Sequence, residues 1–270
     1  MKINNKQELD SYIQTQNNEL LWFTFANYGY KDYVKNFLES CRKYNTNFKL
    51  HLLCSDDLLF NEIGDDTNCY CIKSNLFFNN NLTSDFFDIE HIECKQIMTS
   101  KLDVFSNILS YLKINNINKY GYIDTDIILF KDPTDIFLNL MTKYPDTNIF
   151  AQCDENSKEC NDFFKCPNVC TGIIVFKYDD FLLKLLDYKA LDVDVTKFVC
   201  ADQDYLNYVC RKTNYNICTI SKNILANGTL NGLKDNYPII VPETINCIHF
   251  NWMVGTQKKE YMQKNNLWFI

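Results

Sequence analysis

The chain alternates between short apolar runs and longer segments with apolar residues at helical spacing. Two segments, 33–44 and 94–112, carry the helical spacing, and residues 55–57 have the composition of a helix start. Residues 27–30 and the Asn-rich stretch 75–88 are expected as a turn and a surface loop. The apolar runs predict buried strands at residues 20–26, 48–54, 69–72 and 122–130. Strands and helices in this order indicate an α/β fold whose mainly parallel sheet is covered on both faces.

The second half of the chain continues this pattern less regularly. A helix is expected at residues 201–210, with 193–200 as a less certain lead-in. Further strands are expected at residues 149–154, 171–178, 216–220 and 245–250. Neither an internal repeat nor a linker is evident. We therefore expect a single domain over residues 1–270, in which the C-terminal part covers the ligand edge of the sheet.

Asp124 and Asp126 lie one residue apart in the apolar run 122–130. Asp is disfavoured in strands and costly to bury unless it is paired or binds a metal ion. A hard divalent cation with oxygen ligands would resolve that cost and would also bind phosphate oxygens. Asp-x-Asp alone more often marks a solvated strand end. Here the apolar flanks and the turn at residues 131–133 favour a metal site instead. Open α/β sheets bind ligands at the carboxyl ends of their strands, where this pair is expected.

Composition narrows the class of protein. The 270 residues are 46% hydrophobic, as in globular proteins, and the net charge of −7 argues against broad nucleic-acid binding. The polar N-terminus lacks signal-peptide form, and no apolar stretch is long enough to cross a bilayer, so a cytosolic location is expected, including that of a viral or organellar factory. The 13 cysteines are an odd number. Cys153, Cys160, Cys166 and Cys170 lie close together in the sequence but lack Cys-x-x-Cys spacing. We therefore favour reduced thiols that pack in the core, while a zinc site or a local disulfide stays open.

Further segments accompany the acidic pair in a characteristic order: 23–30, 99–103, 170–172 with 201–207, and 248–258. Together they resemble the metal-dependent nucleotide-sugar glycosyltransferases of the GT-A fold, most closely the retaining glycogenin-like and plant xylosyl- or galactosyltransferase-like groups. The resemblance implies a Rossmann-like sheet with a smaller antiparallel C-terminal part. It also implies a nucleotide-binding half near residues 20–132 and a sugar- and acceptor-binding half near 133–270.

The resemblance further implies an activity and its cofactors. The reaction would move a hexose, N-acetylhexosamine or pentose from a UDP-sugar to a hydroxyl acceptor, with retention of the anomeric configuration. Mn²⁺ or Mg²⁺ would be the cofactor. The acceptor stays open, and the apolar tail 267–270 leaves two options, packing on this chain or on a partner such as a second copy in a homodimer.

The matching motifs carry over specific roles. The metal ligands implied are Asp124, Asp126 and His249. The nucleotide-binding residues implied are Thr24, Ala26, Asn27, Tyr30, Asp124, Thr125, Thr171, Gly172, Gly255 and Lys258, with Tyr30 favoured over Tyr28 for stacking on uracil. The catalytic residues implied are Asp202, Gln203 and Lys101. Two departures affect the sugar site and the acceptor lip: Cys170 stands where the family usually has Asn, and Lys259-Glu260 replaces a Pro and a Trp.

Each of these residues also has an ordinary structural interpretation. The Tyr residues would be turn and core aromatics, Lys101 would extend its ammonium to water, Asp202 would cap a helix, and His249 would be a satisfied structural residue. Three rival functions remain open. A nucleotidyltransferase would normally carry a Gly-rich basic loop after the first strand, where this chain has residues 27–30. A nucleotide-sugar-binding protein without turnover gains support from Cys170, and a structural α/β domain with a chance motif order is the third.

Overall fold

The computed structural model describes residues 1–16, 19–44, 46–78, 82–87, 91–154, 168–227, 241–251, 253 and 255–270. Its strands are β1 (Lys2–Ile3), β2 (Leu21–Ala26), β3 (Leu50–Cys54), β4 (Cys69–Lys73), β5 (Lys119–Ile123), β6 (Ile127–Leu129), β7 (Ile149–Cys153), β8 (Val169–Lys177), β9 (Ile217–Ile220), β10 (Leu225–Asn227) and β11 (Cys247–His249). Its α-helices are α1 (Lys6–Gln14), α2 (Lys31–Lys43), α3 (Asp57–Ile63), α4 (Ile92–Ile114), α5 (Thr134–Lys143), α6 (Asp180–Leu186), α7 (Ala201–Thr213) and α8 (Gly255–Lys264).

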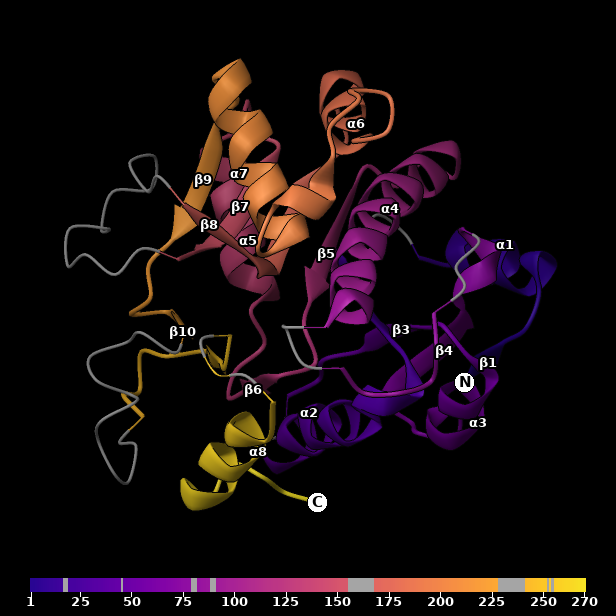
Figure 1. The fold of residues 1–270 in the computed structure, drawn as a ribbon, viewed down its shortest axis with the longest axis vertical. Coiled ribbons are helices and arrows are strands. Elements are labelled where there is room, and N and C mark those ends of the chain that lie inside the picture. The colour runs from indigo at the N-terminus through magenta and orange to yellow at the C-terminus, as the bar shows by residue number, and fades with distance from the viewer. Residues whose placement is uncertain are drawn as a thin grey trace.

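Eight strands form the main sheet in the order β1-β4-β3-β2-β5-β8-β7-β9. Neighbouring strands are parallel except at β8, which runs antiparallel to both β5 and β7. Helices α1, α4, α6 and α7 contribute to the apolar cluster on one face, and α2, α3 and α5 to the cluster on the other (Figure 1). The expected α/β class with a mostly parallel, doubly covered sheet is confirmed.

A second, smaller sheet has the order β10-β11-β6. β11 runs antiparallel to β6, while β10 and β11 are parallel, so this sheet is mixed rather than purely antiparallel. α8 and the C-terminal residues pack against it, and α8, coloured yellow, lies beside α2 in Figure 1. The backbone amide of Phe269 donates to Asn36 Oδ1 at 2.6 Å, and the Trp268 ring centroid lies 5.4 Å from that of Tyr33. The apolar tail therefore packs on this chain, and the homodimer stays a prediction.

Two parts of the chain differ from the sequence-based expectation. The N-terminus, which appeared only polar, forms β1 and α1; its helix buries just Leu9 and Ile13, too few apolar positions for a recognisable period. The run 122–130 is not one strand, because β5 ends at Ile123 and β6 begins at Ile127. Asp124 and Asp126 thus lie in a connecting turn.

The helices of the described residues include none that is both long and apolar enough to cross a bilayer. The cytosolic location expected from the sequence stays a prediction.

Candidate active site

The turn that carries Asp124 and Asp126 joins the main sheet to the small one. The backbone amide of Asp124 donates to the carbonyl of Gly172 on β8 at 2.7 Å. The carbonyl of Asp126 accepts from the amide of Phe250, the residue after β11, at 3.1 Å. Each end of the turn is therefore anchored to a different sheet, and both carboxylates are fixed where the sheets meet.

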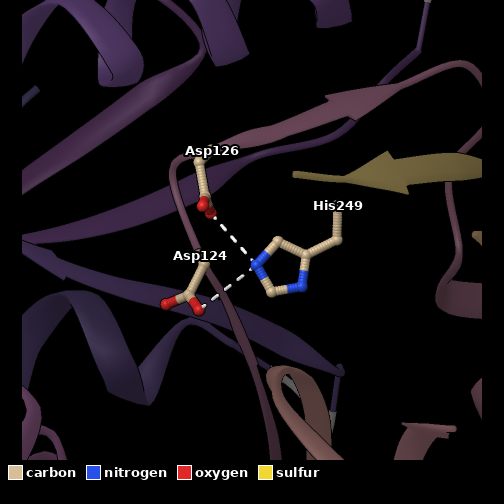
Figure 2. Close-up of side chains that lie close together, drawn as sticks. All are labelled: Asp124, Asp126 and His249. Atoms are coloured by element: carbon tan, nitrogen blue, oxygen red, sulfur yellow. Dashed lines mark ion pairs between the residues drawn. The ribbon is translucent and has the colours of Figure 1, made fainter. Parts of the chain in front are cut away.

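His249 reaches the same point from the end of β11. Its Nε2 atom lies 3.1 Å from Asp126 Oδ1 and 3.7 Å from Asp124 Oδ2 (Figure 2). The imidazole is buried, and a Cβ atom at Gly172 would lie 2.0 Å from its Cε1 atom. Gly172 therefore leaves the space that the ring occupies. One ligand atom from each of the three side chains lies within 4.8 Å of the others, a donor set suited to a divalent cation.

Opposite charges hold these groups in their ionised forms. Burial alone would raise the pKa of Asp126, but Lys258 and His249 outweigh it and hold that pKa well below its usual range. Burial alone would lower the pKa of His249, but the Asp126 carboxylate reverses the effect and raises it well above 6.5. Lys258 Nζ lies 2.5 Å from Asp126 Oδ2. Positive charge from two side chains thus neutralises a buried carboxylate.

Lys101 connects the acidic pair to the start of α7. Its Nζ atom lies 2.9 Å from Asp124 Oδ1 and 3.1 Å from Asp202 Oδ2. The hydroxyl of Thr171 donates to Asp202 Oδ2 at 2.7 Å. Burial would lower the pKa of Lys101, but the two carboxylates raise it well above 10.5. Lys101 is therefore a fixed buried cation rather than a side chain that extends into solvent.

A cavity of about 230 Å³ opens over these groups. It is lined by most of the residues predicted from the sequence: Ala26, Tyr30, Lys101, Asp124, Thr125, Asp126, Thr171, Gly172, Asp202, Gln203, His249, Gly255 and Lys258. Thr24 and Asn27 are buried and are not part of this lining. The amide of Asn27 instead donates to the carbonyls of Thr83 and Asp85. These two hydrogen bonds tie Asn27 to the backbone of residues 83–85.

The cavity also has residues that the sequence did not single out. Phe86 and Phe87 line it, and the hydroxyl of Tyr30 donates to the carbonyl of Phe87 at 3.0 Å. The Phe86 ring centroid lies 4.8 Å from that of Tyr30, so the aromatic wall is built from two distant segments. The sequence signal that could have revealed these two residues is an aromatic pair inside an otherwise polar loop.

Asp154 is another residue that the sequence did not single out. Its carboxylate accepts from the side-chain amides of Gln203 at 2.8 Å, Asn251 at 3.0 Å and Asn227 at 3.2 Å. Because Gln203 Nε2 donates to Asp154, the hydrogen bond to Asp154 fixes the orientation of the Gln203 carboxamide at the cavity wall.

The thiol of Cys170 stands beside the imidazole rather than in solvent. Its Sγ atom lies 3.4 Å from His249 Nδ1, and burial raises the pKa of the thiol. Cys170 is a free cysteine, and Cys153 is buried on β7. Cys160 and Cys166 lie outside the described residues.

Comparisons with known proteins agree with this fold. A family model described as nucleotide-diphospho-sugar transferase matches residues 66–263. Among solved structures, the galactosyltransferase LgtC in complex with donor and acceptor sugar analogs has a TM-score of 0.52 at 14% identity, over 93% of this chain and 97% of that one. The bifunctional glycosyltransferase WbbM has a TM-score of 0.54 at 14% identity over 92% of this chain, which spans 50% of the WbbM chain. A glycosyltransferase involved in glycosylation of the major capsid of PBCV-1 has a TM-score of 0.50 at 11% identity, over 91% of this chain and 98% of that one.

No curated protein matches the chain significantly. The fold is that of the GT-A enzymes, and Asp124, Asp126 and His249 form a group that could hold a metal ion. Because the family model covers most of its length, the chain belongs to the nucleotide-diphospho-sugar transferase family and is a glycosyltransferase. This membership favours sugar transfer over the nucleotidyltransferase and the purely structural alternatives.

Proposed function

We propose that the protein transfers a hexose, N-acetylhexosamine or pentose from a UDP-sugar to a hydroxyl acceptor, with a divalent cation and with retention of configuration. The observation that carries this proposal is the convergence of three side chains on one point: Asp124 and Asp126 from the turn between β5 and β6, and His249 from β11. Two carboxylates and an imidazole are ligands that suit Mn²⁺ or Mg²⁺. The space that Gly172 leaves for the imidazole supports the fit.

The lysines around this point suit a diphosphate. When bound, the cation would offset charge on the leaving diphosphate. Lys258 would add an ammonium, and Gly255, at φ 55° at the start of α8, would allow the backbone close to the phosphates. Lys101, held between two carboxylates, would keep Asp124 and Asp202 in place and contribute positive charge near the sugar phosphate bond.

The residues beyond the diphosphate suit the sugar. Asp202 would orient sugar hydroxyls, and Gln203 would present its carbonyl oxygen to the same ring. Both nearby carboxylates are engaged, Asp202 by Lys101 and Asp154 by three amides. This supports a retaining route in which the acceptor attacks from the face that the diphosphate leaves, without a carboxylate nucleophile.

The aromatic wall suits the nucleobase. Tyr30 and Phe86 offer ring surface in the lining of the cavity, and base stacking on such rings is worth about 1–3 kcal/mol. We further propose that one catalytic domain spans the chain, with residues near 20–132 binding mainly the nucleotide and residues near 133–270 binding mainly sugar and acceptor.

The test is turnover of a panel of UDP- and GDP-sugars, with and without Mn²⁺ and with excess chelator. Hydrolysis or transfer with one UDP-sugar, lost on chelation and in Asp126→Ala, is expected. Asp126→Asn serves if the Ala variant does not fold, and Asp65→Ala, at an exposed position, is the matched control. Full turnover in chelator or in both Asp126 variants would contradict the metal role.

A further inference from the structure

Gln152 is a buried polar side chain directly behind His249. It lies on β7 with 0% of its surface exposed, in a strand whose other residues include Ile149, Phe150 and Ala151. An amide in such a place is costly unless all of its hydrogen-bonding groups find partners. Its partners therefore indicate what it does.

The orientation of the Gln152 amide follows from its partners on β10. Its Nε2 atom lies 2.9 Å from the carbonyl oxygen of Leu225 and 2.8 Å from that of Ala226. Carbonyl oxygens only accept hydrogen bonds, so the NH₂ group must face them. The Oε1 atom then faces the opposite way and lies 3.2 Å from His249 Nδ1.

This orientation fixes the imidazole tautomer. An amide oxygen only accepts, so His249 must carry a hydrogen on Nδ1. In the ionised ring Nε2 also carries a hydrogen, which faces Asp126 Oδ1 3.1 Å away. A cation bound between the carboxylates would displace that hydrogen, and the ring would then be the neutral Nδ1–H tautomer with its Nε2 lone pair toward the cation.

The neighbouring sulfur is compatible with the same arrangement. Cys170 Sγ, 3.4 Å from Nδ1, also receives the backbone N–H of Gly172 at 3.4 Å and the amide of Asn251 at 3.6 Å. The sulfur therefore acts as an acceptor toward these groups, and the Nδ1 hydrogen points between two acceptors.

An irregularity in the main sheet places Gln152 at this point. β7 pairs with β8 in one register through Ala151, opposite Ile174, and in a shifted register from Gln152, opposite Cys170. Such bulges re-aim side chains near functional sites. The shift brings Gln152 between β10 and His249.

We propose that Gln152 is a positioning residue of the metal site, which holds His249 as the Nδ1–H tautomer with Nε2 free to coordinate a cation. The inference rests on the proposed metal role of Asp124, Asp126 and His249. Outer hydrogen-bond partners of metal-binding histidines typically contribute 10- to 100-fold in metal affinity.

The first test reads the tautomer directly. The protein contains 3 histidines, so long-range ¹H–¹⁵N spectra of histidine-labelled protein with Mg²⁺ should resolve each ring. His51 is an internal reference, because its Nδ1 lies 2.9 Å from the Trp22 carbonyl and its Nε2 lies 2.6 Å from the Tyr12 hydroxyl. His249 is expected as Nδ1–H in the wild type and as a mixture in Gln152→Leu. An Nε2–H signal for His249 in the Mg²⁺-loaded wild type would overturn the proposal.

The second test measures binding of Mn²⁺ alone, from the paramagnetic resonance signal of the free ion. Gln152→Leu is expected to weaken Mn²⁺ binding about 10- to 100-fold. Gln152→Glu, which keeps an oxygen toward Nδ1, should restore part of that loss. His51→Leu removes a buried polar side chain from the other face of the sheet and should bind Mn²⁺ as the wild type does.

The outcomes separate the two proposals. A wild type that binds no Mn²⁺ would overturn the proposed metal role. A wild type that binds Mn²⁺, with equal affinity in Gln152→Leu, would overturn the role of Gln152 alone. If Gln152→Leu does not fold, the wild-type tautomer decides the question: an Nδ1–H signal for His249 supports the role of Gln152, and an Nε2–H signal overturns it.

Discussion

Replacing Gly172 with Ala is predicted to disable metal binding while the fold survives. The added Cβ would lie 2.0 Å from Cε1, 2.5 Å from Nδ1 and 2.8 Å from Nε2 of His249, whereas ordinary contacts begin at 3.4 Å. The ring must therefore retreat by about 1.4 Å, and metal sites tolerate deviations of only about 0.2 Å in ligand distance. We expect metal affinity to fall at least 10- to 100-fold, or about 1.4–2.7 kcal/mol.

The assay combines Mn²⁺ titration with urea denaturation in the absence of metal. Overpacking a core position typically costs about 1–3 kcal/mol, so Gly172→Ala should still fold. Gly121→Ala is the matched control, because its Cβ would lie 2.4 Å from the Trp22 ring, away from the site. It should lose similar stability and keep its Mn²⁺ affinity. Wild-type Mn²⁺ affinity in folded Gly172→Ala would refute the steric argument.

Two further predictions concern buried charges. Lys101→Met leaves the carboxylates of Asp124 and Asp202 without their shared cation, so the free energy of unfolding should fall by about 3 kcal/mol. The double variant Lys101→Met/Asp202→Asn should recover part of that loss. Equal stability of wild type and Lys101→Met in urea denaturation would contradict this prediction. Burial lowers the pKa of His51 from 6.5 to about 4, only partly opposed by its bond to the Trp22 carbonyl. Because the unfolded chain then takes up a proton first as the pH falls, unfolding free energy should drop by about 2 kcal/mol between pH 7 and pH 5. His51→Leu should lack that part of the pH dependence, and identical pH profiles for the two proteins would exclude it.

The elements with the clearest patterns were predictable from the sequence. α2 and α4 follow apolar periods within two residues of the expected bounds, and Asp56 caps α3 by accepting from the Leu59 amide, as the helix-start signal indicated. These features depend on local hydrogen bonds and on one buried face, which neighbouring residues alone specify.

The N-terminal strand and helix were not predictable in this way. β1 has two residues and gains its structure by pairing with β4, about 70 positions away. The order of strands and the reversed direction of β8 likewise depend on contacts between distant segments.

The sequence by itself determined the α/β class, the acidic pair and the set of motifs that resemble GT-A enzymes, because residue type and spacing encode local structure and chemistry. Only the tertiary structure decided that Asp126 and His249 meet, since that contact requires β6 and β11 to pair across more than a hundred residues. The same holds for Gln152, whose amide is informative only when its partners on β10 and at His249 are known. Hydrogen bonds between side chains depend on distance and direction in space, and a linear order of residues specifies neither.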